Sequence, residues 1–287
     1  MARILAAGIA TLDIVNEVSS YPEEDTETRA LAQRISRGGN ASNTLCVLSQ
    51  FDHQCYLAGV LVDEADGQII ETDLARYQIN TQFCPRPHTG KMPTSYITLN
   101  RLTGSRTIVH YRDCPELSFE QFQHIDLAGF DWLHFEGRNI TELAKMLEYC
   151  HKTMPNIPIS LEVEKPRDNI ETLFGAADWL FFSKDYAQAT GHLSAESLFA
   201  TLPANCSATC TWGASGAYGL ENGRLFFSPP VVLDRVVDTL GAGDTFNAGM
   251  IHSLLTSNNF ADSLYFANQL AARKCQQHGF DQLLKSL

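Results

Sequence analysis

The chain has 287 residues, of which 44% are hydrophobic and 19% are charged, so it can bury a substantial core and is neither disordered nor fibrous. Its length favours one large domain with a smaller appendage over two equal domains. The formal net charge of −12 argues against a nucleic-acid partner, because binding a phosphate backbone needs a basic surface.

The sequence predicts neither a membrane protein nor a disulfide-bonded one. The apolar run at the N-terminus is interrupted by Asp13, and no stretch reaches the roughly 18 apolar residues that a membrane-spanning helix needs. The eight cysteines include no C-x-x-C pair, so we expect reduced and mostly buried thiols. We therefore expect a cytoplasmic protein with no membrane partner.

Apolar runs alternate with helical periodicity along most of the chain. Residues 3–15 (RILAAGIATLDIV) predict a first strand buried on both faces. Similar runs occur at residues 131–137, 157–164, 178–184 and 208–213. Helical spacing of apolar residues occurs at residues 40–51, 140–150 and 260–275. This alternation predicts an α/β fold with a mostly parallel sheet.

Two regions alternate apolar and polar residues with the period of a strand that has one solvated face. These are residues 27–36, and the pair 93–100 and 105–113 joined by a turn at 101–104. We expect them to form a small antiparallel sheet, spanning approximately residues 12–37 and 91–113, that protrudes from a single domain of residues 1–287. Its apolar side would need a ligand cleft or a second subunit to cover it.

A glycine-rich stretch, VVDTLGAGDTFNAG at residues 236–249, runs into a predicted helix. Gly241 and Gly243 permit close approach of a ligand, and the free N–H groups of a helix start favour an anion. If that anion is a phosphoryl group in transfer, Asp244 could accept the proton of the attacking hydroxyl. Asp244 could equally cap the helix after a glycine turn, and the stretch by itself leaves both interpretations open.

Two familiar nucleotide-binding motifs do not fit this sequence. A dinucleotide fingerprint needs a third glycine where Phe246 stands, which disfavours a nucleotide-dependent oxidoreductase. The Gly-Lys pair in HTGKMPT lacks the rest of a Walker loop.

A second polar cluster, RGGNASN at residues 37–43, opens the next predicted helix. Asn40 and Asn43 would lie on its first turn, and side-chain amides both donate to and accept from sugar hydroxyls. Asp13 would lie beyond the carboxyl end of the first strand, where open α/β sheets bind ligands. The alternatives are a helix cap for Asn40 and a solvated loop position for Asp13.

The two clusters together resemble the signature motifs of the ribokinase-like, or PfkB-type, sugar kinases. Further blocks in family order, including HFEGRN, EVEKPR, FFSKD and GFD, are similar to the ketohexokinase subfamily over nearly the whole chain. The resemblance implies a ribokinase-like three-layer α/β/α sandwich with a β-sheet lid. It also implies transfer of the γ-phosphoryl group of ATP to the C1 hydroxyl of D-fructose, by a homodimer whose lids clasp one another.

The resemblance further implies roles for individual residues. Asp244 would be the catalytic base, and Gly241, Ala242 and Gly243 would form the anion hole. The ketose would be held by Asp13, Gly39, Asn40 and Asn43, with Asp25 reaching into the partner subunit's site. The nucleotide would be contacted by Arg106 and by the loop of Gly213, Ala214, Ser215 and Gly216, although a surface arginine and a plain hairpin turn are the simpler interpretations.

The metal ligands stay unassigned at this stage. ATP would carry Mg²⁺, and K⁺ is a further candidate ion, but SKDY at residues 183–186 stands where many members of the family have an N-x-x-E motif. Candidate ligands are Glu162, Glu164, Asp185 and Asp238. Another kinase of the family, acting on a different ketose, ribose or a nucleoside, and a sugar-binding regulator without activity are the alternative functions.

Overall fold

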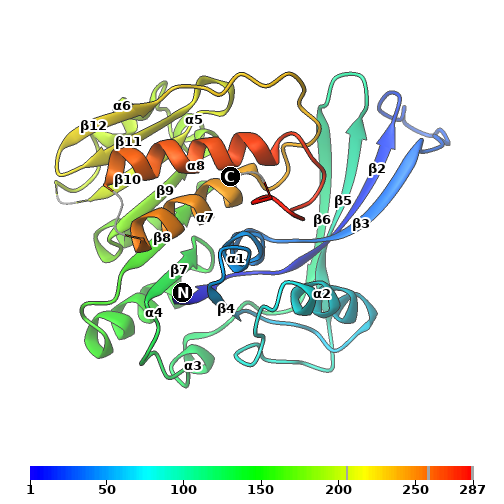
Figure 1. Ribbon diagram of the computed structural model, residues 1–287. Coiled ribbons are helices and arrows are strands. Elements are labelled where there is room, and N and C mark those ends of the chain that lie inside the picture. The colour runs from blue at the N-terminus through cyan, green and yellow to red at the C-terminus, as the bar shows by residue number, and fades with distance from the viewer. Residues whose placement is uncertain (205, 257–258, 286–287) are drawn as a thin grey trace.

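The computed structural model describes residues 1–204, 206–256 and 259–285. A large sheet lies at the centre with helices on both faces, and a separate small sheet projects from one side (Figure 1). No helix within these ranges is long and apolar enough to cross a membrane. The predicted three-layer α/β architecture with a small additional sheet is confirmed.

The large sheet has the strand order β12-β11-β10-β9-β8-β7-β1-β4. Its strands are β1 (Arg3–Ala7), β4 (Gln54–Ala58), β7 (Trp132–Glu136), β8 (Ile159–Val163), β9 (Trp179–Ser183), β10 (Ser207–Thr211), β11 (Ala217–Glu221) and β12 (Arg224–Ser228). Neighbours from β10 to β4 pair in parallel, whereas β11 and β12 run antiparallel. Every residue of β7 and β8 is buried, as expected for parallel strands covered on both faces.

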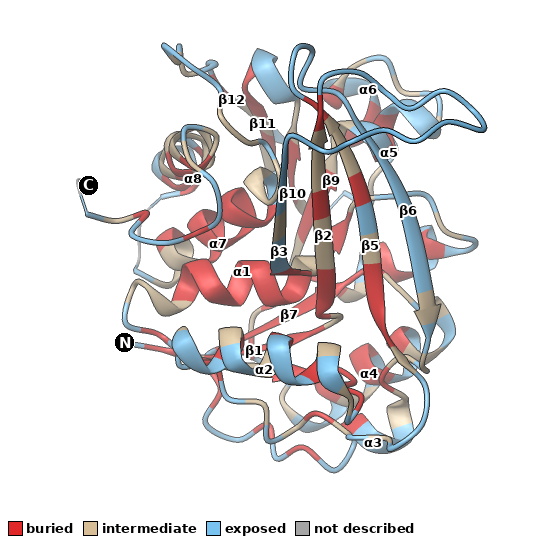
Figure 2. Cartoon of the chain, turned by 90° about the vertical axis from the view of Figure 1, so that its right-hand side faces the viewer, coloured by how far each residue is buried: buried red, intermediate tan, exposed pale blue. Residues whose placement is uncertain are grey.

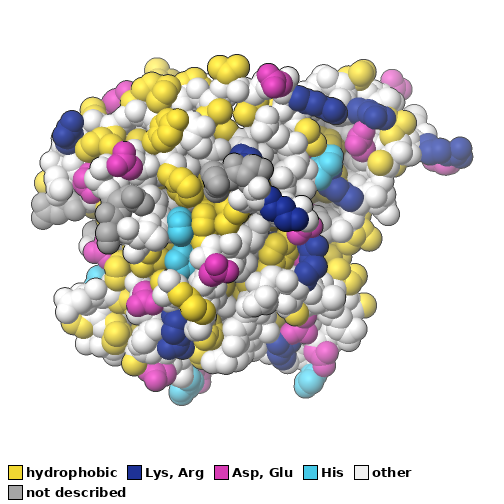
Figure 3. All heavy atoms as spheres, viewed as in Figure 1, with side chains coloured by type: hydrophobic (Ala, Val, Ile, Leu, Met, Phe, Trp, Pro, Cys, Tyr) yellow, Lys and Arg dark blue, Asp and Glu magenta, His cyan; other side chains and the backbone are white. Residues whose placement is uncertain are grey.

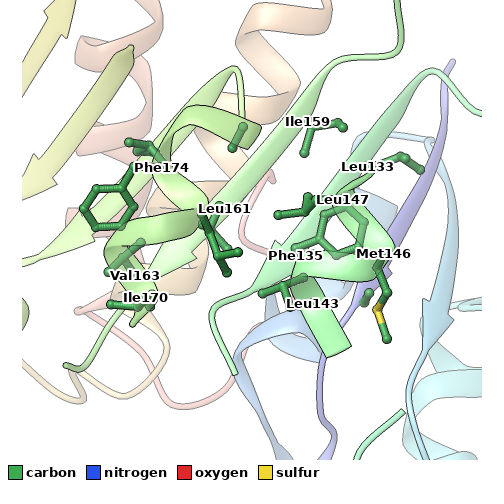
Figure 4. Packing of buried hydrophobic residues seen from close by; sticks show 14 of the residues in the cluster. Leu133, Phe135, Leu143, Met146, Leu147, Ile159, Leu161, Val163, Ile170 and Phe174 are labelled. Carbon is green, nitrogen blue, oxygen red and sulfur yellow. The ribbon is translucent and has the colours of Figure 1, made fainter. Parts of the chain in front are cut away.

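Two hydrophobic cores fill the two faces of this sheet. The helices α1 (Asn40–Ser49), α7 (Ala242–Leu255) and α8 (Phe260–Lys274) belong to one core, to which α2 (Ala65–Arg76) adds its buried residues. The other core contains α3 (Phe119–Phe122), α4 (Ile140–Thr153), η1 (Ile170–Ala176), α5 (Lys184–Ala189) and α6 (Ala195–Phe199). In this second core Leu143, Met146 and Leu147 of α4 pack against the sheet residues Phe135 and Leu161 (Figure 4). Burial of each such side chain stabilises the folded state by about 1.5 to 3 kcal/mol. This packing holds in place the sheet that carries the site.

The small sheet has the order β3-β2-β5-β6, with strands β2 (Thr11–Val18), β3 (Ala32–Gly38), β5 (Lys91–Asn100) and β6 (Arg106–Asp113). The outer pairs are antiparallel as expected, but the central pair of β2 and β5 is parallel. Figure 2 shows β6 exposed along most of its length, whereas β2 and β5 alternate between buried and less buried residues. That this sheet moves as a lid stays a prediction.

The prediction of one continuous strand over residues 3–15 is wrong. The chain leaves the large sheet after Ala7 and enters the small sheet at Thr11. The connection is held by the buried carboxylate of Glu136, whose Oε2 accepts from the N–H of Ile9 at 3.0 Å. Asp13 therefore lies within β2 of the small sheet and does not follow the first strand of the large one.

The strand predicted at residues 27–36 begins later than expected. It forms only from Ala32 onward, and residues 20–31 are exposed and outside any strand. The register with β2 explains why β3 begins at Ala32. Ala32 pairs with Glu17, which is the residue before the end of β2, so β2 ends before it could pair with residues 27–30.

Candidate functional site

A cleft of about 890 Å³ lies between the small sheet and the carboxyl ends of strands in the large sheet. Both glycine-containing motifs, at residues 37–43 and 236–249, lie on its wall, so segments about 200 residues apart in the sequence meet there. The residues from these motifs that line it are Arg37, Gly39, Asn40, Asn43, Asp238, Thr239, Leu240, Gly241, Gly243, Asp244 and Asn247.

Arg and Lys side chains line this cleft among a larger number of Asp and Glu side chains. Arg34, Arg106, Arg138, Lys165 and Arg167 also line it. On the face drawn in Figure 3, Lys and Arg side chains gather toward the right-hand side, over the small sheet and α2. These arginines and lysines can pair with an anionic ligand at their own positions, although the acidic side chains of the wall leave the cleft without a net positive charge.

The glycine turn before α7 requires glycine at one position in particular. Gly241 is the N-cap of the helix and has φ 77°, in the left-handed region. A Cβ atom there would lie 2.3 Å from Cζ of Phe280, so no other residue fits without displacing that ring. Gly243 lines the cleft, whereas Ala242 does not, and the N–H of Ala242 donates to the carbonyl of Thr239 at 3.2 Å.

Asp244 is buried in the first turn of α7 and does not cap the helix. The N-cap is Gly241, and Oδ2 of Asp244 accepts a hydrogen bond from Nδ2 of Asn43 at 2.6 Å. The capping interpretation is therefore wrong. Burial raises the pKa of Asp244 to about 7, although the hydrogen bond from Asn43 opposes this shift. A carboxyl group with a pKa near the working pH is well matched to proton transfer.

Asn40 is likewise a helical residue and not a cap. The N-cap of α1 is Gly39, with φ 95°. Nδ2 of Asn40 donates to Oε1 of Glu162 at 3.2 Å and to Oε2 of Glu164 at 3.1 Å. Because both carboxylates hold the amide nitrogen, Oδ1 of Asn40 is the atom left to accept from a ligand.

Asp13 lines the cleft from β2, and the solvated-loop interpretation is wrong. Its Oδ1 accepts from Oγ1 of Thr11 at 3.0 Å, and burial raises its pKa. Arg106 lines the cleft from β6 and donates from Nη1 to Oγ1 of Thr239 at 3.1 Å. The small sheet thus contributes both an acidic and a basic side chain to the wall.

Two sets of predicted residues lie away from the cleft. Asp25 is exposed, with φ 60°, in the segment between β2 and β3. In the loop of residues 213–216, Gly213–Ser215 form the short η2 turn and are exposed, whereas Gly216 after them is buried. None of the four lines the cleft, although Thr211 two residues before them does. Their predicted roles, in a partner's site and in nucleotide binding, stay predictions.

Two glutamates have structural connections that sequence reasoning did not anticipate. Glu162 was expected only as a metal ligand, but its Oε1 also accepts from Nδ2 of Asn247 at 3.1 Å, so it joins β8 to α1 and α7. Glu136 was not singled out, yet it holds the turn at Ile9. Both lie at or near the end of a wholly buried strand, and an acid at that position was the available signal.

The four candidate metal ligands all line the cleft, and Asp238 pairs with Arg34 at 3.1 Å. Within the described ranges, no group of three or more His, Cys, Asp or Glu side chains is arranged to hold a metal ion.

Comparison with known proteins identifies the family. Residues 1–286 match the pfkB family of carbohydrate kinases. The chain is 38% identical to ketohexokinase of Mus musculus over an alignment 294 positions long, which covers 98% of this chain and 99% of that protein.

Solved structures agree with this assignment at the level of the fold. Ribokinase of Thermotoga maritima matches with a TM-score of 0.77 at 18% identity, covering 97% of this chain and 94% of that one. Ribokinase of Arabidopsis thaliana, solved in complex with ribose and ATP, matches with a TM-score of 0.78 at 18% identity, covering 97% and 94%. The chain therefore belongs to the pfkB family of carbohydrate kinases and is an ATP-dependent sugar kinase.

Proposed function

We propose that this kinase transfers the γ-phosphoryl group of ATP to the C1 hydroxyl of D-fructose. The similarity to a mammalian ketohexokinase along almost the full length of both chains supports the choice of a ketose. The observation that carries the chemistry is the buried carboxyl group of Asp244, held by Asn43 at the start of α7.

In the proposed reaction Asp244 accepts the proton of the sugar hydroxyl as its oxygen attacks the γ-phosphorus. The bond from the γ-phosphorus to the bridging oxygen breaks, and ADP leaves with that electron pair. The negative charge on the transferred group faces the glycine turn, where the N–H groups of Gly243 and Asp244 and the helix dipole stabilise it. Positioning and charge neutralisation of this kind are the main contributions of a protein to phosphoryl transfer.

The remaining cleft residues divide between the two substrates in this proposal. Asp13, Gly39, Asn40 and Asn43 bind the sugar, with Oδ1 of Asn40 accepting from a hydroxyl. Arg106 binds the nucleotide phosphates, to which its guanidinium can donate two hydrogen bonds. Mg²⁺ accompanies the ATP, since this ion keeps several waters and binds mainly through phosphates and few carboxylates.

We further propose a cytoplasmic homodimer formed through the small sheets. The eight cysteines are all free, which suits a reducing compartment. In the sheet register Ile35 pairs with Ile14, Ile14 with Tyr96, and Tyr96 with Val109, so an apolar row crosses all four strands. Three of these side chains are exposed in the single chain, and a second copy would cover them. Asp25 would then reach the partner's cleft.

A coupled assay of ADP release over ketoses, aldoses and nucleosides tests the function, with ³¹P NMR identifying the phosphorylated carbon. We expect preference for D-fructose and a fructose 1-phosphate product. Asp244→Asn should lower kcat about 10²- to 10⁴-fold, because the proton acceptor is lost. Asp52→Asn, the same exchange at an exposed position, is the matched control. Full activity of Asp244→Asn would refute the mechanism, and preference for ribose or a nucleoside would refute the substrate.

A further inference from the structure

Arg37 is a buried charge beside the site that the proposed reaction does not use. Its side chain is 1% exposed, at the end of β3. A buried guanidinium is costly unless its donors are satisfied, and here Nε donates to Oδ2 of Asp73 at 2.9 Å. Nη1 donates to Oγ of Ser42 at 2.9 Å and to Oδ1 of Asn43 at 2.6 Å. The guanidinium also lies 5.7 Å from the centre of the Phe280 ring.

The contact with Arg37 decides which way the amide of Asn43 points. A guanidinium only donates hydrogen bonds, so the atom of Asn43 facing it must be the carbonyl oxygen. The nitrogen is then the atom that faces Asp244, where it donates to the carboxylate at 2.6 Å. In the opposite orientation the amide would set donor against donor at Arg37 and oxygen against oxygen at Asp244.

We propose that Arg37 is a positioning residue for phosphoryl transfer, which locks the amide of Asn43 so that its nitrogen holds the carboxylate of Asp244 in the reactive orientation. This inference rests on the proposed role of Asp244 as the base. Arg37 itself touches neither the reacting atoms nor the proton, and it acts only through Asn43 and through its charge.

The charges around Asp244 give this arrangement a measurable consequence. Acidic groups face it from three places, which are Glu136 on β7, Glu162 on β8 and Glu164 just after β8. Arg37 on β3 and Lys274 on α8 are the cations that interact with it, and Asn43 on α1 is its hydrogen-bond donor. Arg37 therefore favours the ionised carboxylate both directly and through the orientation of Asn43.

Asp73 supplies a matched comparison on the other side of the guanidinium. It accepts from Nε of Arg37 and, through Oδ1, from Nη2 of Arg76 at 2.9 Å. Asp73→Asn breaks the same buried ion pair as a change at Arg37 does. It nevertheless leaves the donor to Asn43 in place and removes a negative charge, so the two variants should affect the base in opposite directions.

The experiment compares the dependence of kcat on pH in the unaltered protein with that in the variants Arg37→Met, Arg37→Lys and Asp73→Asn. On the acidic side of the profile, called here the acid limb, kcat falls as Asp244 becomes protonated. Arg37→Met should move this limb upward by roughly one pH unit, because an opposite charge near a carboxyl group shifts its pKa by about that amount. Its loss of kcat should be largest below pH 7 and shrink at higher pH. Arg37→Lys keeps the positive charge but loses the forked donors of the guanidinium, so its acid limb should lie between those of Arg37→Met and the unaltered protein. Asp73→Asn should leave the limb in place or move it downward.

A uniform fall of kcat at all pH values in Arg37→Met, or an upward shift shared with Asp73→Asn, would show a merely structural role and overturn the inference. Asp244→Asn, measured alongside, separates this outcome from failure of the proposed function. If Asp244→Asn keeps its turnover, the base is another group. If Asp244→Asn loses turnover while the limb of Arg37→Met stays in place, only the role of Arg37 is refuted.

Discussion

Nη2 of Arg34 donates to Oδ2 of Asp238 at 3.1 Å, and this contact ties the small sheet to the loop that leads into α7. Arg34 lies on β3, at one edge of the small sheet, and Arg106 on β6, at the other edge, bonds Thr239 in the same loop. Both edges of the sheet thus contact the segment before the glycine turn. A ligand that binds Arg34 and Arg106 would break their contacts with Asp238 and Thr239, and so would free both the small sheet and the loop.

Arg106→Gln tests whether this arginine binds the nucleotide. Loss of a charged donor to a phosphate should raise the KM for ATP roughly tenfold or more, with little change in the KM for the sugar. Steady-state kinetics with each substrate varied in turn measures the two values. Arg101→Gln is the control, since Arg101 lies in the adjacent turn and pairs with Glu17 at 3.0 Å. Equal changes in both KM values would contradict the assignment.

Gly241→Ala and Gly243→Ala form a matched pair within one turn. Gly241→Ala should lower the free energy of unfolding by about 1 to 3 kcal/mol, because the left-handed conformation is strained for alanine and the new Cβ meets Phe280. At Gly243 no described heavy atom outside the helix and its neighbours lies within 4 Å of the place a Cβ would take, so Gly243→Ala should leave stability nearly unchanged. Urea unfolding measures both. Similar losses in the two variants would exclude the ring contact as the cause.

The buried imidazole of His134 should make the free energy of unfolding depend on pH. It is wholly buried on β7, and burial lowers its pKa to about 3. An unfolded histidine titrates near pH 6.5, so between these values the unfolded chain binds a proton that the folded chain does not, and stability falls as the pH falls. On acidification from pH 7 to pH 5, His134 should lower the free energy of unfolding by about 2 kcal/mol.

Urea unfolding of the unaltered protein and of His134→Asn at both pH values measures that cost. Asparagine can still bond Oγ of Ser160, which lies 2.8 Å from Nδ1 of His134, but it does not titrate. The variant should therefore lose less stability on acidification. The same loss in both proteins would show that other groups carry the pH dependence.

The proposed dimer can be tested at the apolar row of the small sheet. Val109, which is 66% exposed, should be buried against a second copy, so Val109→Glu should give a monomer. Ile69→Glu, at an exposed apolar residue on α2, should leave the dimer intact. Light scattering over a range of concentrations measures both. A monomeric unaltered protein would refute the dimer and remove Asp25 from the proposed site.

Much of the fold could be predicted because local patterns determine it. The runs that form β7, β8 and β9 are apolar along most of their length, and a strand covered on both faces accommodates such runs. The break after Ala7 could not be seen, because the apolar pattern continues across it. It depends on Glu136, a residue 127 positions from Ile9 in the sequence.

The site was predictable as two motifs and a resemblance, but not as a set of contacts. Asn43 and Asp244 are 201 positions apart, and nothing local indicates that their side chains meet. Arg37 opens the RGGNASN motif without a predicted role, because a sequence does not tell a buried arginine from a solvated one. Its importance depends on Asp73 and Phe280, which come from α2 and from the segment after α8.

The position of Phe280 in the sequence determines the stage of synthesis at which the site can form. It packs beneath Gly241 and beside Arg37, and its carbonyl accepts from Nε2 of Gln50 at 2.8 Å. A growing chain contains both glycine motifs, at residues 37–43 and 236–249, before residue 280 is added. Until that ring emerges from the ribosome, neither the turn at Gly241 nor the buried guanidinium has its packing partner. Newly synthesised enzyme should therefore acquire activity only after residue 280 has left the ribosome, and not gradually as the sheet forms.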